Sequence, residues 1–92
     1  MYIRINRYSI PNKDQSWPAE SQVLKELMET YTQQGKLLER VVKQIDPYTT
    51  EITWIWDSKE SFAAFNNDPV HNARRNQLKS FTTTELISEE EI

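Results

Sequence analysis

The sequence predicts an α+β fold with the element order βαββαβ, in which one antiparallel sheet carries both helices on a single face. Three patterns lead to this expectation. Apolar and polar residues alternate in residues 1–10 and again in residues 51–56, which is the period of a strand. Apolar residues recur at helical spacing between residues 23 and 31. β-branched residues are frequent in residues 37–45, which favours another strand.

The first strand is expected in residues 1–10, where alternation divides the side chains between two faces. Ile3 and Ile5 lie on one face, and the other face carries Tyr2, Arg4, Asn6 and Tyr8. Only one of these sets can line a pocket beneath the helices. The alternation leaves open which set does so.

A helix is expected after the polar turn that follows Pro11, beginning at Ser16 or a neighbouring residue. Pro18 is tolerated in the first turn because its missing N–H would have no intrahelical partner there. Gly35 is the only glycine of the chain, and it stands where a helix ends in the left-handed conformation. The apolar side of the helix consists of Val23, Leu24, Leu27, Met28 and Tyr31.

Residues 37–45 and 51–56 are expected to form a hairpin around a turn at residues 46–49, which contains Asp and Pro. One face of the second strand carries Ile52, Trp54 and Trp56. Trp residues at this spacing most often fill a core or a subunit interface. They also suit the apolar wall of a binding pocket.

The second helical region is expected to begin with Asp57 as N-cap and Glu60 in the capping-box position. Phe62 and Phe65 are three residues apart, so they share one side of this helix. Residues 66–69 end in proline and interrupt the helix, because proline lacks a backbone donor and restrains the residue before it.

A further helical stretch is expected in residues 69–79. Its basic residues form either a solvated face or a small anion site, and they are Arg74, Arg75 and Lys79. The last strand is expected in residues 82–87. Residues 88–92 contain three consecutive Glu and are expected to form a frayed or extended tail. Residues 1–92 then make up a single domain.

The composition excludes several classes of function. The chain has 92 residues, no Cys, one His, one Gly and a formal charge of −3. Disulfide scaffolds, Cys-based metal centres and multi-His metal centres are therefore ruled out. A net acidic chain is not expected to bind nucleic acid. Because no apolar run is long enough for a transmembrane helix, we expect no membrane partner and a cytoplasmic location.

The aromatic content predicts a partner. The chain has three Trp, four Tyr and three Phe, and these ten large side chains exceed what one small core readily buries. A sheet with helices on one face also leaves its opposite face bare. We therefore expect a homodimer that packs sheet face against sheet face, with the aromatic surplus in the interface or in a pocket for a small aromatic ligand.

The element order and the segment from Thr53 to His71 resemble those of the antibiotic-biosynthesis-monooxygenase-like superfamily of ferredoxin-like dimeric α+β barrels. In that superfamily a strand ending in an aromatic residue is followed by an acidic or Ser cap, a short helix and a polar break with Pro. The likeness covers nearly the whole chain in topology and about twenty residues in sequence. It is specific for the fold, which hosts several chemistries.

Three branches of the superfamily differ in the residues they use. The haem-degrading branch resembles this chain at Asn6, but its Trp position falls on Phe65 and its axial His position falls near Arg75, which cannot bind iron. The stress-responsive branch includes polyketide cyclases, whose catalytic His matches His71 and whose partner Tyr matches Phe65. The quinone-forming branch lets a deprotonated phenolic substrate react with O₂ and needs no cofactor.

The resemblance implies a cofactor-independent oxygenase that acts on a small aromatic or polyketide-like compound. His71 and Asn6 are then the candidate catalytic residues, with His71 as base. The candidate substrate-binding residues are Arg4, Trp54, Trp56, Phe62 and Phe65. Two alternatives stay open: a non-catalytic small-molecule-binding or structural dimer, and a polyketide-cyclase-like enzyme. No cofactor or metal is expected.

Overall fold

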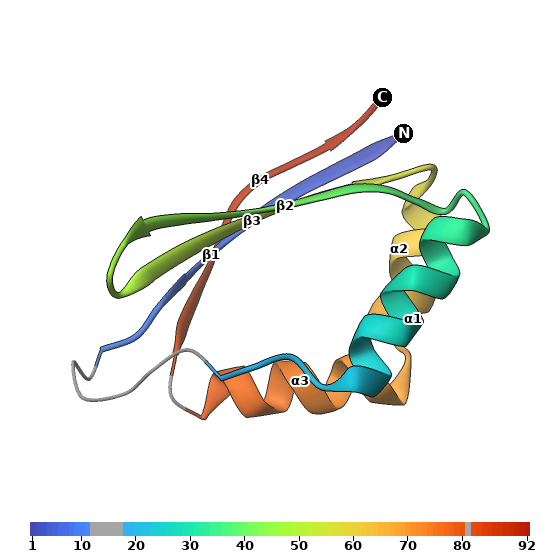
Figure 1. Cartoon of the computed structure of the whole chain (residues 1–92). Coiled ribbons are helices and arrows are strands. Elements are labelled where there is room, and N and C mark those ends of the chain that lie inside the picture. Colours follow the sequence, from blue (N-terminus) through green and yellow to red (C-terminus); the bar gives the residue numbers. More distant parts are fainter. Residues whose placement is uncertain (12–17, 81) are drawn as a thin grey trace.

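A computed structural model describes residues 1–11, 18–80 and 82–92 of the chain. The elements follow the order β1 (Tyr2–Ser9), α1 (Gln22–Gln33), β2 (Leu37–Asp46), β3 (Thr49–Trp56), α2 (Lys59–Asn66), α3 (Pro69–Lys79) and β4 (Thr83–Glu91). The strands form one antiparallel sheet with the order β2-β3-β1-β4. All three helices lie on the same side of this sheet (Figure 1). The predicted ferredoxin-like α+β fold is confirmed.

The pairing of β1 with β3 decides which face of the first strand lies under the helices. Arg4 pairs with Trp54 and Asn6 pairs with Ile52. Side chains of directly paired residues in an antiparallel sheet point to the same side. Because Trp54 and Ile52 are buried in the core, Arg4 and Asn6 belong to the helix-covered face, and Ile3 and Ile5 belong to the opposite one.

The core is an aromatic cluster between the sheet and the helices. The largest fully buried side chains are Trp56, Tyr2 and Phe65, which are at most 1% exposed. Leu24 of α1 and Leu37 of β2 complete the contact between the helix layer and the sheet. β3 alternates strictly between buried and half-buried residues, as the sequence pattern predicts for a strand with one covered face.

The opposite face of the sheet is not covered by any described part of the chain (Figure 1). Cross-strand pairing places Ile3 beside Ile55 and Val41 beside Thr53 on this face. Val41 is 45% exposed. An apolar strip therefore runs across β2, β3 and β1 on the side away from the helices.

The first helix begins later than expected. Ser16 and the turn after Pro11 lie outside the described residues, and Pro18 precedes the helix instead of standing in its first turn. Ser21 is the N-cap, and its Oγ accepts a hydrogen bond from the backbone N–H of Leu24 at 3.1 Å. The Arg74 guanidinium donates to the backbone oxygen of Pro18 at 3.0 Å, which holds this segment outside the helix. Gly35 has φ 72°, as predicted.

Two further boundaries differ from the prediction. The N-cap of α2 is Ser58 and not Asp57, because the Asp57 backbone N–H donates to the Lys36 carbonyl at 2.8 Å and keeps Asp57 with the strands. β4 continues to Glu91, so four of the residues expected as a tail are paired with β1. The three glutamates are tolerated because β4 is an edge strand, where charged side chains remain in contact with water.

Within the described residues, no helix has the length and apolar character needed to cross a membrane.

Candidate active site

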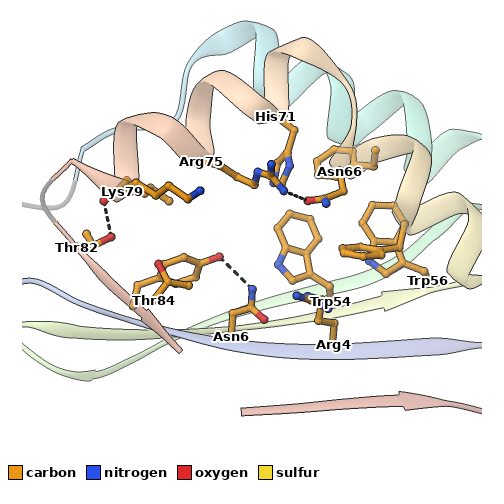
Figure 2. A pocket seen from close by; sticks show the side chains of 14 residues that line it. Arg4, Asn6, Trp54, Trp56, Asn66, His71, Arg75, Lys79, Thr82 and Thr84 are labelled. Carbon is orange, nitrogen blue, oxygen red and sulfur yellow. Dashed lines mark hydrogen bonds between the residues drawn. The ribbon is translucent and has the colours of Figure 1, made fainter. Parts of the chain in front are cut away.

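A cavity of about 340 Å³ lies between the sheet and the helices. Its walls come from β1, β3, β4, α2, α3 and the residue that precedes β4. All seven residues singled out in the sequence line it, and they are Arg4, Asn6, Trp54, Trp56, Phe62, Phe65 and His71. Figure 2 shows His71 on the helix side of the cavity and Asn6 and Trp54 on the sheet side, with their side chains directed into the space between. The structure thus brings together residues that are far apart in the sequence.

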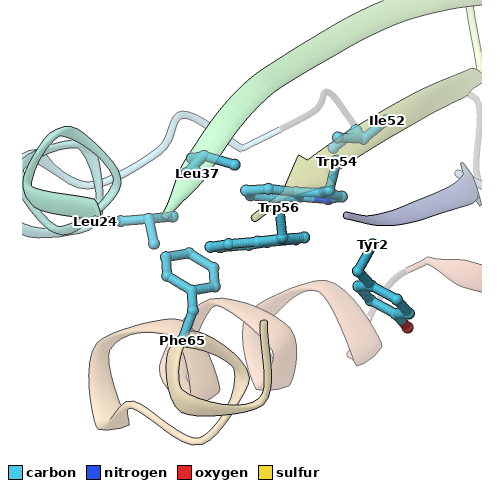
Figure 3. Packing of buried hydrophobic residues seen from close by; sticks show 7 residues of the cluster. All are labelled: Tyr2, Leu24, Leu37, Ile52, Trp54, Trp56 and Phe65. Atoms are coloured by element: carbon cyan, nitrogen blue, oxygen red, sulfur yellow. The ribbon is translucent and has the colours of Figure 1, made fainter. Parts of the chain in front are cut away.

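One end of the cavity is an aromatic wall. The rings of Trp54 and Trp56 are stacked with centroids 5.7 Å apart and planes at 11°, and Phe65 packs against both (Figure 3). Phe62 contacts Trp56 and lies under the Arg4 guanidinium, whose central carbon is 4.9 Å from the ring centroid. These side chains are both core and cavity wall, so the cavity presents a rigid surface suited to a flat aromatic molecule.

The other end of the cavity is polar and was largely missed by sequence reasoning. The additional lining residues are Tyr8, Asn66, Arg75, Leu78, Lys79, Thr82 and Thr84. Thr84 pairs with Tyr8 across β1 and β4, and this register cannot be read from the sequence. The spacing of His71, Arg75 and Lys79 was a usable signal, because residues four apart share one side of a helix.

His71 sits at the junction of the two ends. Its ring centroid lies 4.5 Å from that of Phe65 and 6.3 Å from that of Trp54. Burial, and after it the positive charge of Arg75, lower the pKa of His71 to about 4, against the opposing effect of the Asn66 backbone carbonyl. The imidazole is therefore neutral at pH 7. It is a weaker base than the unperturbed histidine assumed from the sequence.

Several buried polar atoms around the cavity have no hydrogen-bond partner among the described residues. These atoms include Asn6 Oδ1, Trp56 Nε1 and His71 Nδ1. The Asn6 amide nitrogen donates to Tyr8 Oη at 3.4 Å, which leaves its oxygen available as an acceptor. Buried polar groups in proteins are normally paired. All three atoms belong to residues that line the cavity.

At the aromatic end of the cavity, Glu89 of β4 compensates the positive charge of Arg4. Arg4 forms an ion pair with Glu89 at 3.8 Å, and Glu89 also accepts a hydrogen bond from the Tyr2 hydroxyl and pairs with Lys59 at 3.8 Å. The Tyr2 hydrogen bond lowers the pKa of the Glu89 carboxyl. Glu89 lies in the segment expected as a tail, so no sequence pattern connects it with Arg4.

The basic residues of α3 do not act together. Arg74 is buried and donates hydrogen bonds to the backbone of Pro18 and to Gln77. Arg75 and Lys79 line the cavity instead. The expected solvated face therefore splits into one structural arginine and two cations at the cavity.

Comparison with known proteins gives similarity in structure only. No family model matches the chain, and no curated protein is significantly similar to it. One similar solved structure is the N63A mutant of SnoaB from Streptomyces nogalater, which is described as a cofactor-independent oxygenase. It matches with a TM-score of 0.68 and 13% sequence identity, over 99% of this chain and 91% of that one. A protein described as an antibiotic biosynthesis monooxygenase has a TM-score of 0.60 at 15% identity, over 96% of this chain and 97% of that one.

A third similar structure is a dimeric ferredoxin-like protein from an uncultured marine organism, with a TM-score of 0.67 at 12% identity, over 100% of this chain and 94% of that one. These identities are too low to transfer an activity, because the same fold hosts unrelated chemistries. The full-length coverage confirms the resemblance inferred from the sequence at the level of architecture. The chain has the ferredoxin-like α+β fold of the antibiotic-biosynthesis-monooxygenase-like proteins.

Proposed function

We propose that the protein is a monooxygenase-like enzyme that oxidises a small aromatic compound with O₂ and without a bound cofactor. The observation that carries this proposal is the convergence of His71 and Asn6 on one cavity whose opposite wall is aromatic. Its volume of about 340 Å³ lies in the range of small-molecule sites. The cofactor-independent oxygenase with the same fold supports the reaction class.

The aromatic wall would hold the substrate ring against Trp54, with the reacting carbon toward His71. Asn6 Oδ1 would accept a hydrogen bond from a phenolic hydroxyl, which satisfies the unpaired oxygen. His71 is neutral at pH 7 and so has a free lone pair to accept a proton. Since its basicity is low, the reaction would depend on stabilising the substrate anion, for which the cavity supplies cationic side chains.

The chemistry balances for an anthrone-type substrate. The methylene carbon loses two hydrogens and gains one oxygen atom from O₂ as a carbonyl. The second oxygen atom leaves as water with both hydrogens. The protein groups bind and orient the substrate, accept one proton and exclude bulk water, and O₂ is the oxidant.

The test is an aerobic screen of anthrone-type and hydroquinone-type compounds with wild type and His71→Ala. We expect turnover by the wild type and a loss of at least tenfold in the variant. Equal turnover in both would remove His71 from the mechanism. Absence of turnover in both would favour the alternative, a non-catalytic binding dimer in which Trp54, Trp56 and Phe65 serve only as core.

The polyketide-cyclase alternative is less well supported. It requires His71 to act as a base without a neighbouring phenol, because Phe65 lacks the hydroxyl group.

We further propose that the enzyme is a homodimer. The apolar strip of Ile3, Ile5, Ile55 and Val41 supports this assembly, as does the dimeric protein of the same fold. A second copy packed on this face would bury side chains that the chain itself leaves uncovered.

A further inference from the structure

We propose that the cavity selects aromatic compounds that carry a fixed anionic group, with the ring on the Trp54 wall and the anionic group between Arg75 and Lys79. This inference rests on the proposed function in one respect, since it takes this cavity as the substrate site. It adds the charge of the substrate and its orientation.

The side chains that line the cavity carry net positive charge. None of the described lining residues is acidic, whereas three are cationic: Arg4, Arg75 and Lys79. The chain as a whole has a formal charge of −3. The sign of the lining therefore opposes that of the protein, which is the arrangement that draws an anion into a cleft.

The three cations differ in whether an acidic side chain compensates their charge. Arg4 is compensated by Glu89 at 3.8 Å. Neither Arg75 nor Lys79 forms an ion pair with a described residue. The uncompensated positive charge of the lining is thus carried by Arg75 and Lys79. In Figure 2, Lys79 lies on the side of Thr82 and Thr84, and Arg75 reaches Asn66 above Trp54.

The helical spacing of two of the cations also favours a bound anion. Arg75 and Lys79 are four residues apart on α3 and share one side of it, where like charges repel and weaken the helix slightly. Arg75 uses one donor on Asn66 Oδ1 at 2.8 Å, which fixes the guanidinium at the cavity and leaves other N–H groups free to bind. An anion between the two side chains would turn this repulsion into attraction.

Both side chains remain exposed to solvent, so they stand at the open side of the cavity. Each partly solvated ion pair contributes modestly and is screened by salt. We therefore expect about a tenfold preference for an anion over a neutral molecule of the same shape at low ionic strength.

The experiment compares 2-naphthoate with 2-naphthamide by equilibrium dialysis at pH 7.5, in about 20 mM and about 500 mM NaCl. These probes differ in charge and hardly in shape. We expect the carboxylate to bind about tenfold more tightly at low salt and the preference to shrink at high salt. The double variant Arg75→Gln, Lys79→Gln should bind both probes equally, while Lys25→Gln on α1 should keep the preference.

Equal affinity of wild type for the two probes, or binding of neither, would overturn the inference, as would a preference that survives in the double variant. The measurement needs no turnover, so it is independent of the aerobic screen. Anthrone oxidation without anion preference would overturn this inference and keep the proposed function. Anion preference without any oxidation would keep the anion site and overturn the oxygenase.

Discussion

His71 and Arg75 lie one turn apart on α3, and the guanidinium of Arg75 lowers the pKa of the His71 imidazole. Both side chains line the same cavity. The site therefore sets the basicity of its only histidine through a neighbouring cation as well as through burial. Neutralisation of that cation by a bound anion would make His71 a stronger base at the moment the site is occupied.

Substitution of Arg75 by Gln should raise the pKa of His71 above about 4, because it removes a positive charge that disfavours the imidazolium. Burial is the larger cause of the shift, so the pKa should stay below 6.5. The measurement is an NMR titration of the His71 ring protons. Lys25→Gln serves as the control and should leave the titration unchanged; an identical curve for Arg75→Gln would contradict the assigned coupling.

Protein stability should fall as the pH is lowered from about 6.5 to about 4, in part because of His71. Its pKa is lower in the folded state than in the unfolded state, so the unfolded chain binds the extra proton over this range. The contribution is complete above pH 6.5 and amounts to about 3 kcal/mol at most. The measurement is urea unfolding at about pH 6.5 and about pH 4. Between these two pH values, the free energy of unfolding should fall less for His71→Gln than for wild type, and equal losses would contradict the role of His71.

Phe65→Ala should destabilise the fold by about 3 to 5 kcal/mol, because it empties a buried ring site. Phe65 is 1% exposed and contacts Trp54, Trp56 and Tyr31. Chemical denaturation followed by circular dichroism gives the difference. Val23→Ala is the matched control, since Val23 is 56% exposed and its loss should change stability by less than about 0.5 kcal/mol. A loss below 1 kcal/mol at Phe65 would contradict the core assignment.

Sedimentation equilibrium should give about twice the chain mass of 11.0 kDa for the wild type. Ile55→Lys should shift the protein toward monomer, because it places a charge in the apolar strip on the uncovered face of the sheet. Lys25→Gln, on the exposed side of α1, should leave the dimer intact. A wild type that remains monomeric at all concentrations would refute the proposed dimer.

The sequence was informative wherever the period of a strand or a helix decides which face of the element a side chain occupies. Alternation placed Arg4 and Asn6 on one face of β1, and Trp54 and Trp56 on one face of β3. Antiparallel pairing of β1 with β3 then brought these two faces side by side. Helical spacing aligned Phe62 with Phe65. The seven candidate residues therefore reached one cavity because each belongs to the covered face of its element.

The remaining features depend on contacts between distant segments. Glu89 pairs with Arg4 only because β4 lies beside β1, and three consecutive glutamates by themselves suggest a solvated tail. The separation of Arg74 from Arg75 depends on the backbone before α1, to which Arg74 is bound. Neither relationship has a local signal in the sequence.

The most direct test of the proposed oxygenase is mass spectrometry of the product formed from an anthrone-type substrate under ¹⁸O₂. We expect wild type to insert one ¹⁸O atom into the new carbonyl group, and Asn6→Leu to do so at least tenfold more slowly, because Leu has the same size and lacks the amide oxygen. Lys25→Gln should match wild type. Product without ¹⁸O, or formed no faster than in buffer alone, would contradict the proposal that this cavity is an oxygenase active site.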